Sequence, residues 1–207
     1  APLVSAGSHL LLRVGSMLAV FTGSTAIAAR IDDATLAAHQ ITLTMFIFLA
    51  LSLDALAVPA QTLVAEEEGA GGGGLTNLVR RVVVLSLWTA GIIAVALALL
   101  SPLLARAFSS DPAVVSRATV GLLLLAILLL PGAVAFAYDG VLIGAGDYRF
   151  LGRAALAYLL AVLPIAAAVL AVPELGIAGI WVGLIVWMLI RAGVNHLRAR
   201  TIMARWT

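Results

Sequence analysis

The sequence has 207 residues, of which 63% are hydrophobic and only 11% are charged. An ordinary soluble domain carries roughly a quarter charged residues, so this chain lacks the polar surface that would face water. The net charge is +2, and no basic stretch carries interleaved aromatic residues, so nucleic acid is not an expected partner. The absence of cysteine excludes disulfides, zinc–thiolate sites and cysteine nucleophiles. Lipid is the solvent that this composition fits.

The sequence starts at Ala1, and its first apolar run has neither a basic leader nor a small-residue cleavage site. This start does not have the pattern of a secretory signal peptide. We therefore expect the chain to be a piece of a longer protein.

Six apolar stretches are long enough to cross a membrane, which takes about 20 mostly apolar residues. The predicted spans lie near residues 9–29, 35–65, 78–100, 114–138, 150–172 and 175–197. Because the bilayer core offers no water to unpaired backbone groups, helices are the expected structure for such runs. The sequence thus predicts an all-α, polytopic membrane protein whose residues 1–207 form a single six-helix bundle.

Short polar breaks separate these spans, at residues 30–33, 66–74, 109–112, 144–147 and 173–174. The break at 109–112 predicts a helix stop followed by an N-cap at Asp111, with Pro112 at the first helical position. Asp147 is positioned to cap the fifth span. Connections this short predict that successive helices run antiparallel.

All basic residues are arginines, and they are unevenly divided between the two ends of the predicted bundle. Three lie at the end holding the breaks near residues 30 and 110: Arg30, Arg106 and Arg117. We assign nine to the opposite end, which holds both termini: Arg13, Arg80, Arg81, Arg149, Arg153, Arg191, Arg198, Arg200 and Arg205. The positive-inside rule then predicts cytoplasmic termini. We expect a multi-pass protein of the plasma membrane.

Asp54 lies well inside the second span, among leucines and valines. A carboxylate at that depth should be neutral or paired, since charge is costly in hydrocarbon. It is therefore a candidate for proton binding or substrate contact. The alternative is a neutral carboxyl that hydrogen-bonds to another helix and serves packing.

Gln40, Asp54 and Gln61 are separated by multiples of seven residues, which predicts one helical stripe. Such a stripe should face a cavity or a partner helix. Pro59 lies between the last two and should kink or locally unwind the helix, as in many cavity-lining transporter helices. A stripe of interhelical hydrogen bonds without a ligand is the alternative.

Tyr138 and Asp139 end the fourth span and complete the candidates for a substrate or ion pathway. Gly140 and Gly144 have the spacing that allows close helix approach, and Gly179 and Gly183 repeat it in the sixth span. Gly146 belongs to the turn that follows Gly144. These five glycines, like Pro59, are expected to have structural roles.

No catalytic or metal-binding pattern occurs in the sequence. His9, His39 and His196 lie on different spans without paired spacing, so neither a metal site nor an enzyme is expected. The glycine-rich segment 69–74 lacks the lysine of a phosphate-binding loop and is expected to be a flexible linker.

Three stretches together resemble the multidrug and toxic compound extrusion (MATE) family, and within it the DinF-like branch. They are Ala-Ala-His-Gln-Ile at 37–41, Leu-Asp-Ala-Leu-Ala at 53–57 with Gln-Thr-Leu-Val at 61–64, and Tyr-Asp-Gly-Val-Leu-Ile-Gly-Ala-Gly-Asp at 138–147. Their order and spacing match the C-terminal six-helix lobe of that family.

The resemblance implies two six-helix lobes related by pseudo-symmetry, of which the N-terminal lobe is missing here. It implies efflux of bulky, often cationic organic compounds, coupled to an inward flow of protons or sodium ions without any other cofactor. Asp54 would face the central cleft. The acidic residues that bind cations in the sodium-coupled branch, on the first and fourth helices of this lobe, have no counterpart between residues 10–29 or 114–138.

Two other functions are compatible with the sequence. One is a flippase for lipid-linked substrates from the same superfamily, which usually needs a cationic cleft, whereas the interior expected here is acidic or neutral. The other is a membrane scaffold without transport activity. A scaffold should seal Asp54 and Gln40 inside the bundle, whereas a transporter should present them on a concave face.

Overall fold

The computed structural model describes residues 2–204. Within these residues the chain forms α-helices and no strand. The helices are α1 (Pro2–Ile31), α2 (Asp33–Gly69), α3 (Leu75–Phe108), α4 (Pro112–Gly144), α5 (Tyr148–Ala171) and α6 (Gly176–Met203), with a 3-10 turn, η1, at Pro173–Leu175. Six helices in the described part of the chain are long and apolar enough to cross a membrane, which confirms the predicted fold.

The helices extend beyond the predicted apolar spans at most of their ends. The longest, α2, has 37 residues. At 1.5 Å per residue it measures about 55 Å, whereas the hydrocarbon core of a bilayer is about 30 Å thick. The acidic residues 66–68 at its end can therefore lie outside the hydrocarbon while the helix remains continuous.

At one end of the bundle, the helices that follow the turns each begin with an aspartate N-cap. Asp32 separates α1 from α2, and its carboxylate accepts a hydrogen bond of 2.8 Å from the Thr35 N–H. Asp111 caps α4 by accepting from the Ala113 N–H at 2.8 Å, directly before Pro112. These bonds satisfy N–H groups that have no partner within a helix.

Asp147 does not cap α5 as the sequence predicts. It stands at the N-cap position, but no side-chain cap hydrogen bond forms there. Its carboxylate instead accepts a bond of 2.6 Å from Nε of Arg198, whose guanidinium also lies over the Phe150 ring at 5.3 Å. The residue therefore ties the start of α5 to the end of α6.

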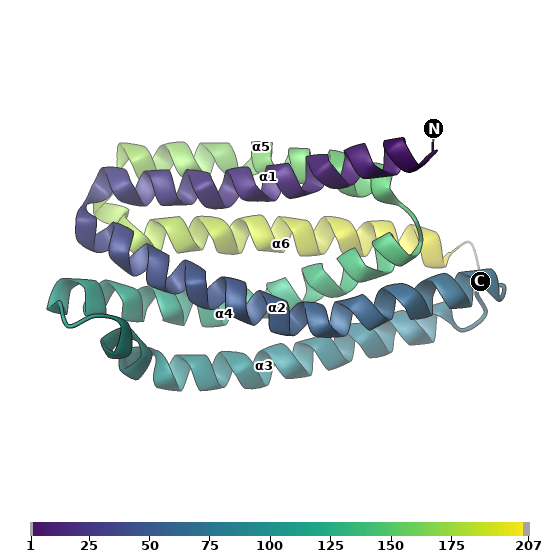
Figure 1. Ribbon diagram of the computed structural model, residues 1–207, viewed down its shortest axis with the longest axis horizontal. Helices are drawn as coiled ribbons and strands as arrows, with labels where there is room; N and C mark the ends of the chain where they lie inside the picture. Colours follow the sequence, from purple (N-terminus) through teal and green to yellow (C-terminus); the bar gives the residue numbers. More distant parts are fainter. Residues whose placement is uncertain (1, 205–207) are drawn as a thin grey trace.

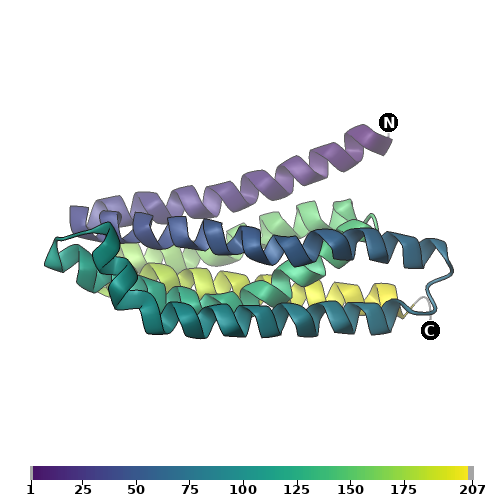
Figure 2. The same ribbon diagram turned by 60° about the horizontal axis from the view of Figure 1, so that its bottom comes forward.

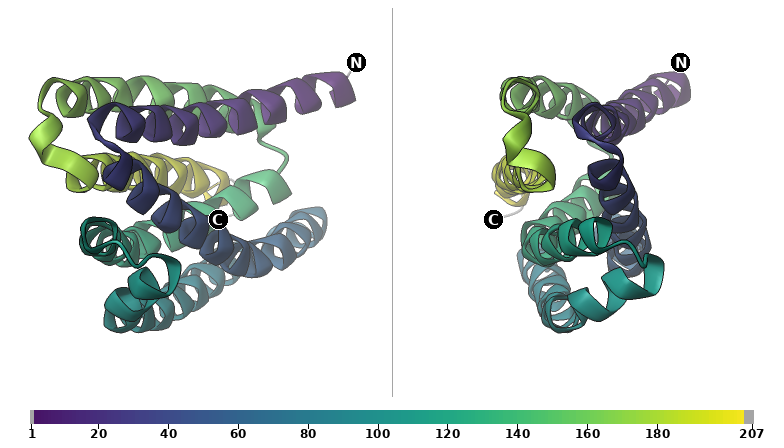
Figure 3. Two further views of the ribbon diagram at one scale, coloured as in Figure 1. Left: turned by 60° about the vertical axis from the view of Figure 1, so that its left-hand side comes forward. Right: turned by 90° about the vertical axis from the view of Figure 1, so that its left-hand side faces the viewer.

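Helix α4 is the central element and packs against α2, α3 and α6, while α1 packs mainly against α5. Figure 1 shows α1 and α5 along one edge of the bundle and α3 along the opposite edge. The end-on view in Figure 3 shows the same order of helices in cross-section. The start of α1 and the end of α6 lie at one end of the bundle, opposite the turn between α1 and α2 (Figure 2).

Large apolar side chains cover the outside of the bundle as well as its core. Trp181, Trp187 and Met188 of α6 are almost fully buried. In contrast, Trp88 and Leu99 of α3 are 70% and 77% exposed. Apolar residues on this scale outside a bundle are stable when the surrounding solvent is lipid.

Candidate functional site

A buried ionic network centred on Asp139 joins helices α1, α4 and α6. Two guanidinium groups, from Arg13 of α1 and Arg191 of α6, both donate to Oδ2 of Asp139. Nδ2 of Asn195 donates to Oδ1 at 2.6 Å. Arg191 and Asn195 are four residues apart, so one face of α6 presents both to α4. Asp139 is thereby the point at which the three helices are tied together.

Arg191 is enclosed on several sides by protein. Its side chain is only 3% exposed, and its guanidinium lies 5.2 Å from the Phe136 ring centre and 5.6 Å from that of Trp187. Aromatic faces attract a cation, which lowers the cost of burying it. Nη1 of Arg191 nevertheless has no hydrogen-bond partner among the described residues.

Further hydrogen bonds connect this network to α5 and to the end of α6. The Tyr158 hydroxyl donates to Oδ1 of Asn195 at 2.8 Å. The Tyr138 hydroxyl lies 2.7 Å from Nδ1 of His196, and the two rings pack edge to face. Tyr138 and Asp139 are therefore both buried among helices, and neither lies on an open surface.

Asp54 stands at the border of this network. The charges of Arg13, Asp139 and Arg191 act on its carboxyl group. Two arginines and one aspartate leave an excess of one positive charge, which an ionised Asp54 would cancel. Asp54 is half-buried and has no hydrogen-bond partner within the described part of the chain.

The three residues of the predicted polar stripe on α2 do not share one environment. Gln40 is exposed, whereas Asp54 and Gln61 are half-buried. None of these three side chains is sealed within the core, as the scaffold interpretation would require.

Pro59 and the paired glycines shape how α2 meets α4. The helix continues without a break through Pro59, so the expected local unwinding does not occur; the ribbon of α2 does bend along its course (Figure 1).

A Cβ atom on Gly140 would lie 2.7 Å from the Ala57 carbonyl oxygen, and one on Gly144 would lie 2.5 Å from that of Gln61. Only glycine permits this approach of the two backbones.

The other glycines lie at a turn and at the contact between α5 and α6. Gly146 has a φ of 68°, a left-handed conformation that favours glycine. A Cβ on Gly183 would lie 3.1 Å from Ile165 of α5. A Cβ on Gly179 would lie 2.7 Å from Leu175 and 3.1 Å from Val169.

Two arginines have partners that the sequence does not indicate. Arg13 and Arg191, which the arginine bias assigns to the end of the bundle that holds the termini, both pair with Asp139 among the helices. The interior therefore carries two cations beside the carboxyl groups of Asp139 and Asp54, which the sequence does not indicate. The remaining bias still holds: six described arginines (Arg80, Arg81, Arg149, Arg153, Arg198 and Arg200) lie at the end with the termini, against three at the other. Arg205 lies outside the described residues.

The members of this network that the sequence does not single out as site candidates are Arg13, Arg191, Asn195 and Tyr158. A signal for Arg191 was present, because apolar residues surround it on both sides in the sixth predicted span. An ionisable residue so placed normally faces a partner in the bundle.

In the described chain, no three metal-ligating side chains gather into a site.

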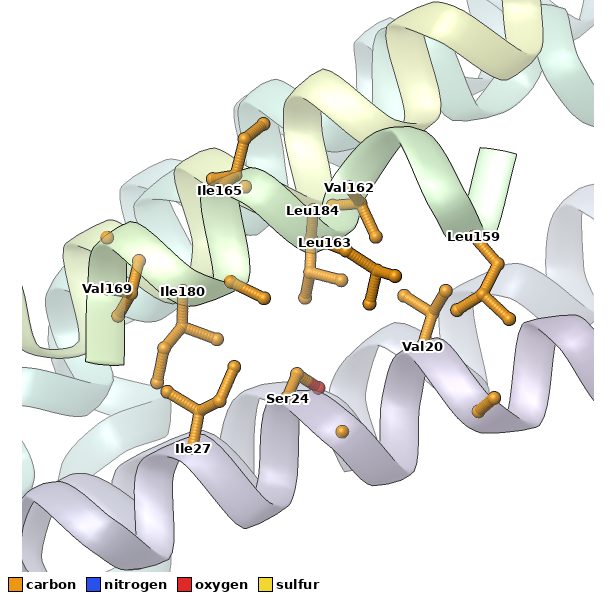
Figure 4. A pocket seen from close by; sticks show the side chains of 15 residues that line it. Val20, Ser24, Ile27, Leu159, Val162, Leu163, Ile165, Val169, Ile180 and Leu184 are labelled. Atoms are coloured by element: carbon orange, nitrogen blue, oxygen red, sulfur yellow. The ribbon is translucent and has the colours of Figure 1, made fainter. Parts of the chain in front are cut away.

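Two other features of the interior, a buried histidine and an apolar cavity, lie apart from the ionic network. His39 is fully buried, with Nε2 lying 3.3 Å from the Ser24 hydroxyl. A cavity of about 80 Å³ lies between α1, α5 and α6, and its lining includes Val20, Leu163 and Leu184 (Figure 4). Its apolar lining suits hydrocarbon and offers no charged group.

Comparison with known proteins gives consistent results. The sequence model of the MatE family matches residues 11–172. The chain is 30% identical over 204 residues to Protein DETOXIFICATION 44, chloroplastic, of Arabidopsis thaliana, covering 96% of this chain and 38% of that protein. It is 31% identical over 202 residues to Protein DETOXIFICATION 45, chloroplastic, of the same plant, covering 95% of this chain and 35% of that protein. Protein DETOXIFICATION 42 is 30% identical over 202 residues, covering 97% and 39% respectively. The chain thus spans less than two fifths of the length of each of these relatives.

Proposed function

Because this chain belongs to the MatE family, the multidrug and toxic compound extrusion proteins, we propose that it is the C-terminal lobe of a secondary active transporter that exports organic compounds. A second, N-terminal six-helix lobe completes the transporter and is the main protein partner of this one. The substrates are small organic molecules, often cationic, and their export is driven by antiport of protons or sodium ions. Within the family we assign the chain to the DinF-like branch, on the three motifs described above.

The observation that carries this proposal is the position of Asp54. A carboxyl in a membrane-spanning helix is costly and persists where it has a use. Asp54 is half-buried, lacks a hydrogen-bond partner in the described structure, and lies within the electrostatic influence of a buried ionic network. A proton, a substrate group or the second lobe would each supply the missing partner. Asp139 of α4 acts on Asp54 through its charge, and Gln40, Gln61 and Tyr138 are the other proposed residues of the pathway.

Dye retention in an efflux-deficient host tests this function. Cells that express the full-length protein should retain less of a cationic dye than cells without it. Asp54→Asn should restore retention, whereas Asp33→Asn, at the exposed start of α2, should not. Equal retention for wild type and Asp54→Asn at equal expression would remove Asp54 from the mechanism. No decrease in retention with the wild type would contradict export of such compounds.

We further propose that the protein resides in the plasma membrane with both ends of this lobe in the cytoplasm. The arginine bias at that end supports this orientation. Two of the relatives are named as chloroplastic and the third is not. Imaging of a fluorescent fusion in the native cell tests the location, and signal confined to an internal membrane would contradict it.

A flippase for lipid-linked substrates is the second candidate. The half-buried Arg13 and the buried Arg191 favour it, because anionic lipid headgroups need cationic partners. Reconstituted protein that translocates a fluorescent lipid-linked anion but not a cationic dye would support a flippase over a drug exporter. A protein that moves neither compound would be better described as a scaffold.

A further inference from the structure

The ionic network around Asp139 leaves one strong donor without an acceptor. Nη1 of Arg191 is buried, and none of the described residues accepts a hydrogen bond from it. A buried donor left without a partner destabilises the fold, and more so when it is charged. Native structures usually fill such a position with a water molecule or an ion.

Each neighbouring acceptor already accepts another hydrogen bond, and none of them accepts one from Nη1 of Arg191. Oδ2 of Asp139 accepts hydrogen bonds from the guanidinium groups of Arg13 and Arg191, and Oδ1 accepts one from the Asn195 amide. Oδ1 of Asn195 in turn accepts a hydrogen bond from the Tyr158 hydroxyl. The rings of Phe136 and Trp187 lie against Arg191 with their faces and provide no oxygen or nitrogen acceptor. An acceptor for Nη1 therefore has to come from outside this network.

The charge of the network points to the nature of that acceptor. Arg13 and Arg191 carry two positive charges against one on Asp139, so the network has a net charge of +1. A water molecule would accept the hydrogen bond from Nη1 but would leave this charge uncompensated. An anion would accept the hydrogen bond and also compensate the charge. An uncompensated charge is most costly in a low-dielectric interior.

The space beside Arg191 limits the size of the anion. A cavity of about 10 Å³, roughly the space of one water molecule, lies among Arg13, Met17, Asp139, Tyr158 and Arg191. A carboxylate or phosphate is too large for it, whereas chloride is a single atom of about twice the volume of water and requires the lining to move apart slightly. Met17 has a flexible, unbranched side chain that can adjust to the difference. The Arg13 side chain is 17% exposed, so the cavity borders on the surface of the bundle.

We propose that this cavity binds a single chloride ion between the Arg191 and Arg13 guanidinium groups. Asp54 competes with the ion electrostatically, because an ionised Asp54 already cancels the excess positive charge. Chloride binding should therefore strengthen when Asp54 is neutral. The site does not depend on the proposed transport function, since binding alone defines it.

Thermal unfolding of the purified full-length protein in detergent tests the site. Chloride is titrated against gluconate at constant ionic strength. A ligand that binds only the folded state raises the unfolding temperature with its concentration. Chloride should raise it for the wild type, and Asp54→Asn should lower the midpoint concentration severalfold. Arg13→Gln, which removes the excess charge, should abolish the response, while Arg13→Lys should retain part of it.

A matched control and a direct observation complete the test. Arg117→Gln alters an arginine at the opposite end of the bundle and should respond to chloride like the wild type. Crystals grown in bromide should show an anomalous peak beside Nη1 of Arg191. Identical unfolding in chloride and gluconate, with only water beside Nη1, would overturn the proposal. An unchanged or weaker response in Asp54→Asn would overturn the competition with Asp54.

Discussion

Asp139 of α4 and Arg191 of α6 form an ion pair whose side chains are only 5% and 3% exposed. The pair fixes two central helices to each other, and Arg13 extends it to α1. Charges buried together in a membrane protein are costly to separate, because neither partner can turn to water. This network therefore sets the relative positions of α1, α4 and α6 beside Asp54.

Removal of the shared carboxylate should strongly destabilise the lobe. Asp139→Asn leaves Arg13 and Arg191 without their common counter-charge. Breaking a buried pair in this way typically costs about 3–5 kcal/mol. We expect a marked fall in the unfolding temperature in detergent, with little change for the exposed Asp33→Asn. Equal unfolding temperatures for Asp139→Asn and the wild type would show that the pair does not hold the bundle together.

The close approach of α2 to α4 should depend on glycine. Gly140→Ala would place a Cβ 2.7 Å from the Ala57 carbonyl oxygen, so the two backbones would have to separate. Gly91→Ala in α3 meets nothing within 4 Å and serves as the control. We expect the first variant to unfold at a lower temperature than the wild type. The second should be neutral or stabilising, because alanine favours a helix over glycine by about 0.5–1 kcal/mol. Matching stability in the two variants would argue against a tight contact.

The proposed orientation can be measured directly, because the sequence contains no cysteine. A single cysteine is introduced at Gly73, between α2 and α3, or at Ser110, between α3 and α4; both positions are exposed. In intact cells a membrane-impermeant maleimide should label Ser110→Cys at once. It should label Gly73→Cys only after the membrane is permeabilised. The reverse pattern would invert the topology.

Stability in acid should depend on Asp32, which lies in the turn between α1 and α2. The Thr35 N–H, assisted by Arg117, holds the pKa of Asp32 below its ordinary value of 3.8. A lowered pKa in the folded state means that the ionised carboxylate contributes stability above pH 3.8. That contribution is lost as the pH falls through the folded-state value.

Asp32→Asn should therefore be less stable than the wild type at neutral pH. The difference in unfolding temperature should shrink as the pH falls below about 4. Parallel scans of the two proteins between pH 7 and pH 3 provide the measurement. A difference that stays constant over this range would mean that the charge of Asp32 is not involved.

The fold could be predicted from the sequence because a membrane imposes simple rules. Apolar length alone identifies helices, and short breaks at Asp32 and Asp111 fix where they turn. The pairing of Asp139 with Arg191 could not be predicted, because the residues are 52 positions apart and no local pattern links them. Arg13 and Arg191 were interpreted as topology signals for the same reason.

The polar stripe shows a second limit of sequence periodicity. Residues seven apart drift by about 20° around a straight helix, so Gln40 and Gln61, three heptads apart, diverge by about 60°. This drift helps to explain why Gln40 is exposed while Asp54 and Gln61 are half-buried. The half-buried state of Asp54 also depends on how α1, α4 and α6 pack beside it, which only the tertiary structure reveals.

The central claim is that this chain is one half of a coupled exporter. The most direct test is transport in proteoliposomes that contain either the full-length protein or this six-helix lobe alone. The account predicts that the full-length protein moves a cationic dye when a proton or sodium gradient is imposed, and that the lobe alone does not. Gradient-driven transport by the isolated lobe, or none by the folded full-length protein, would contradict it.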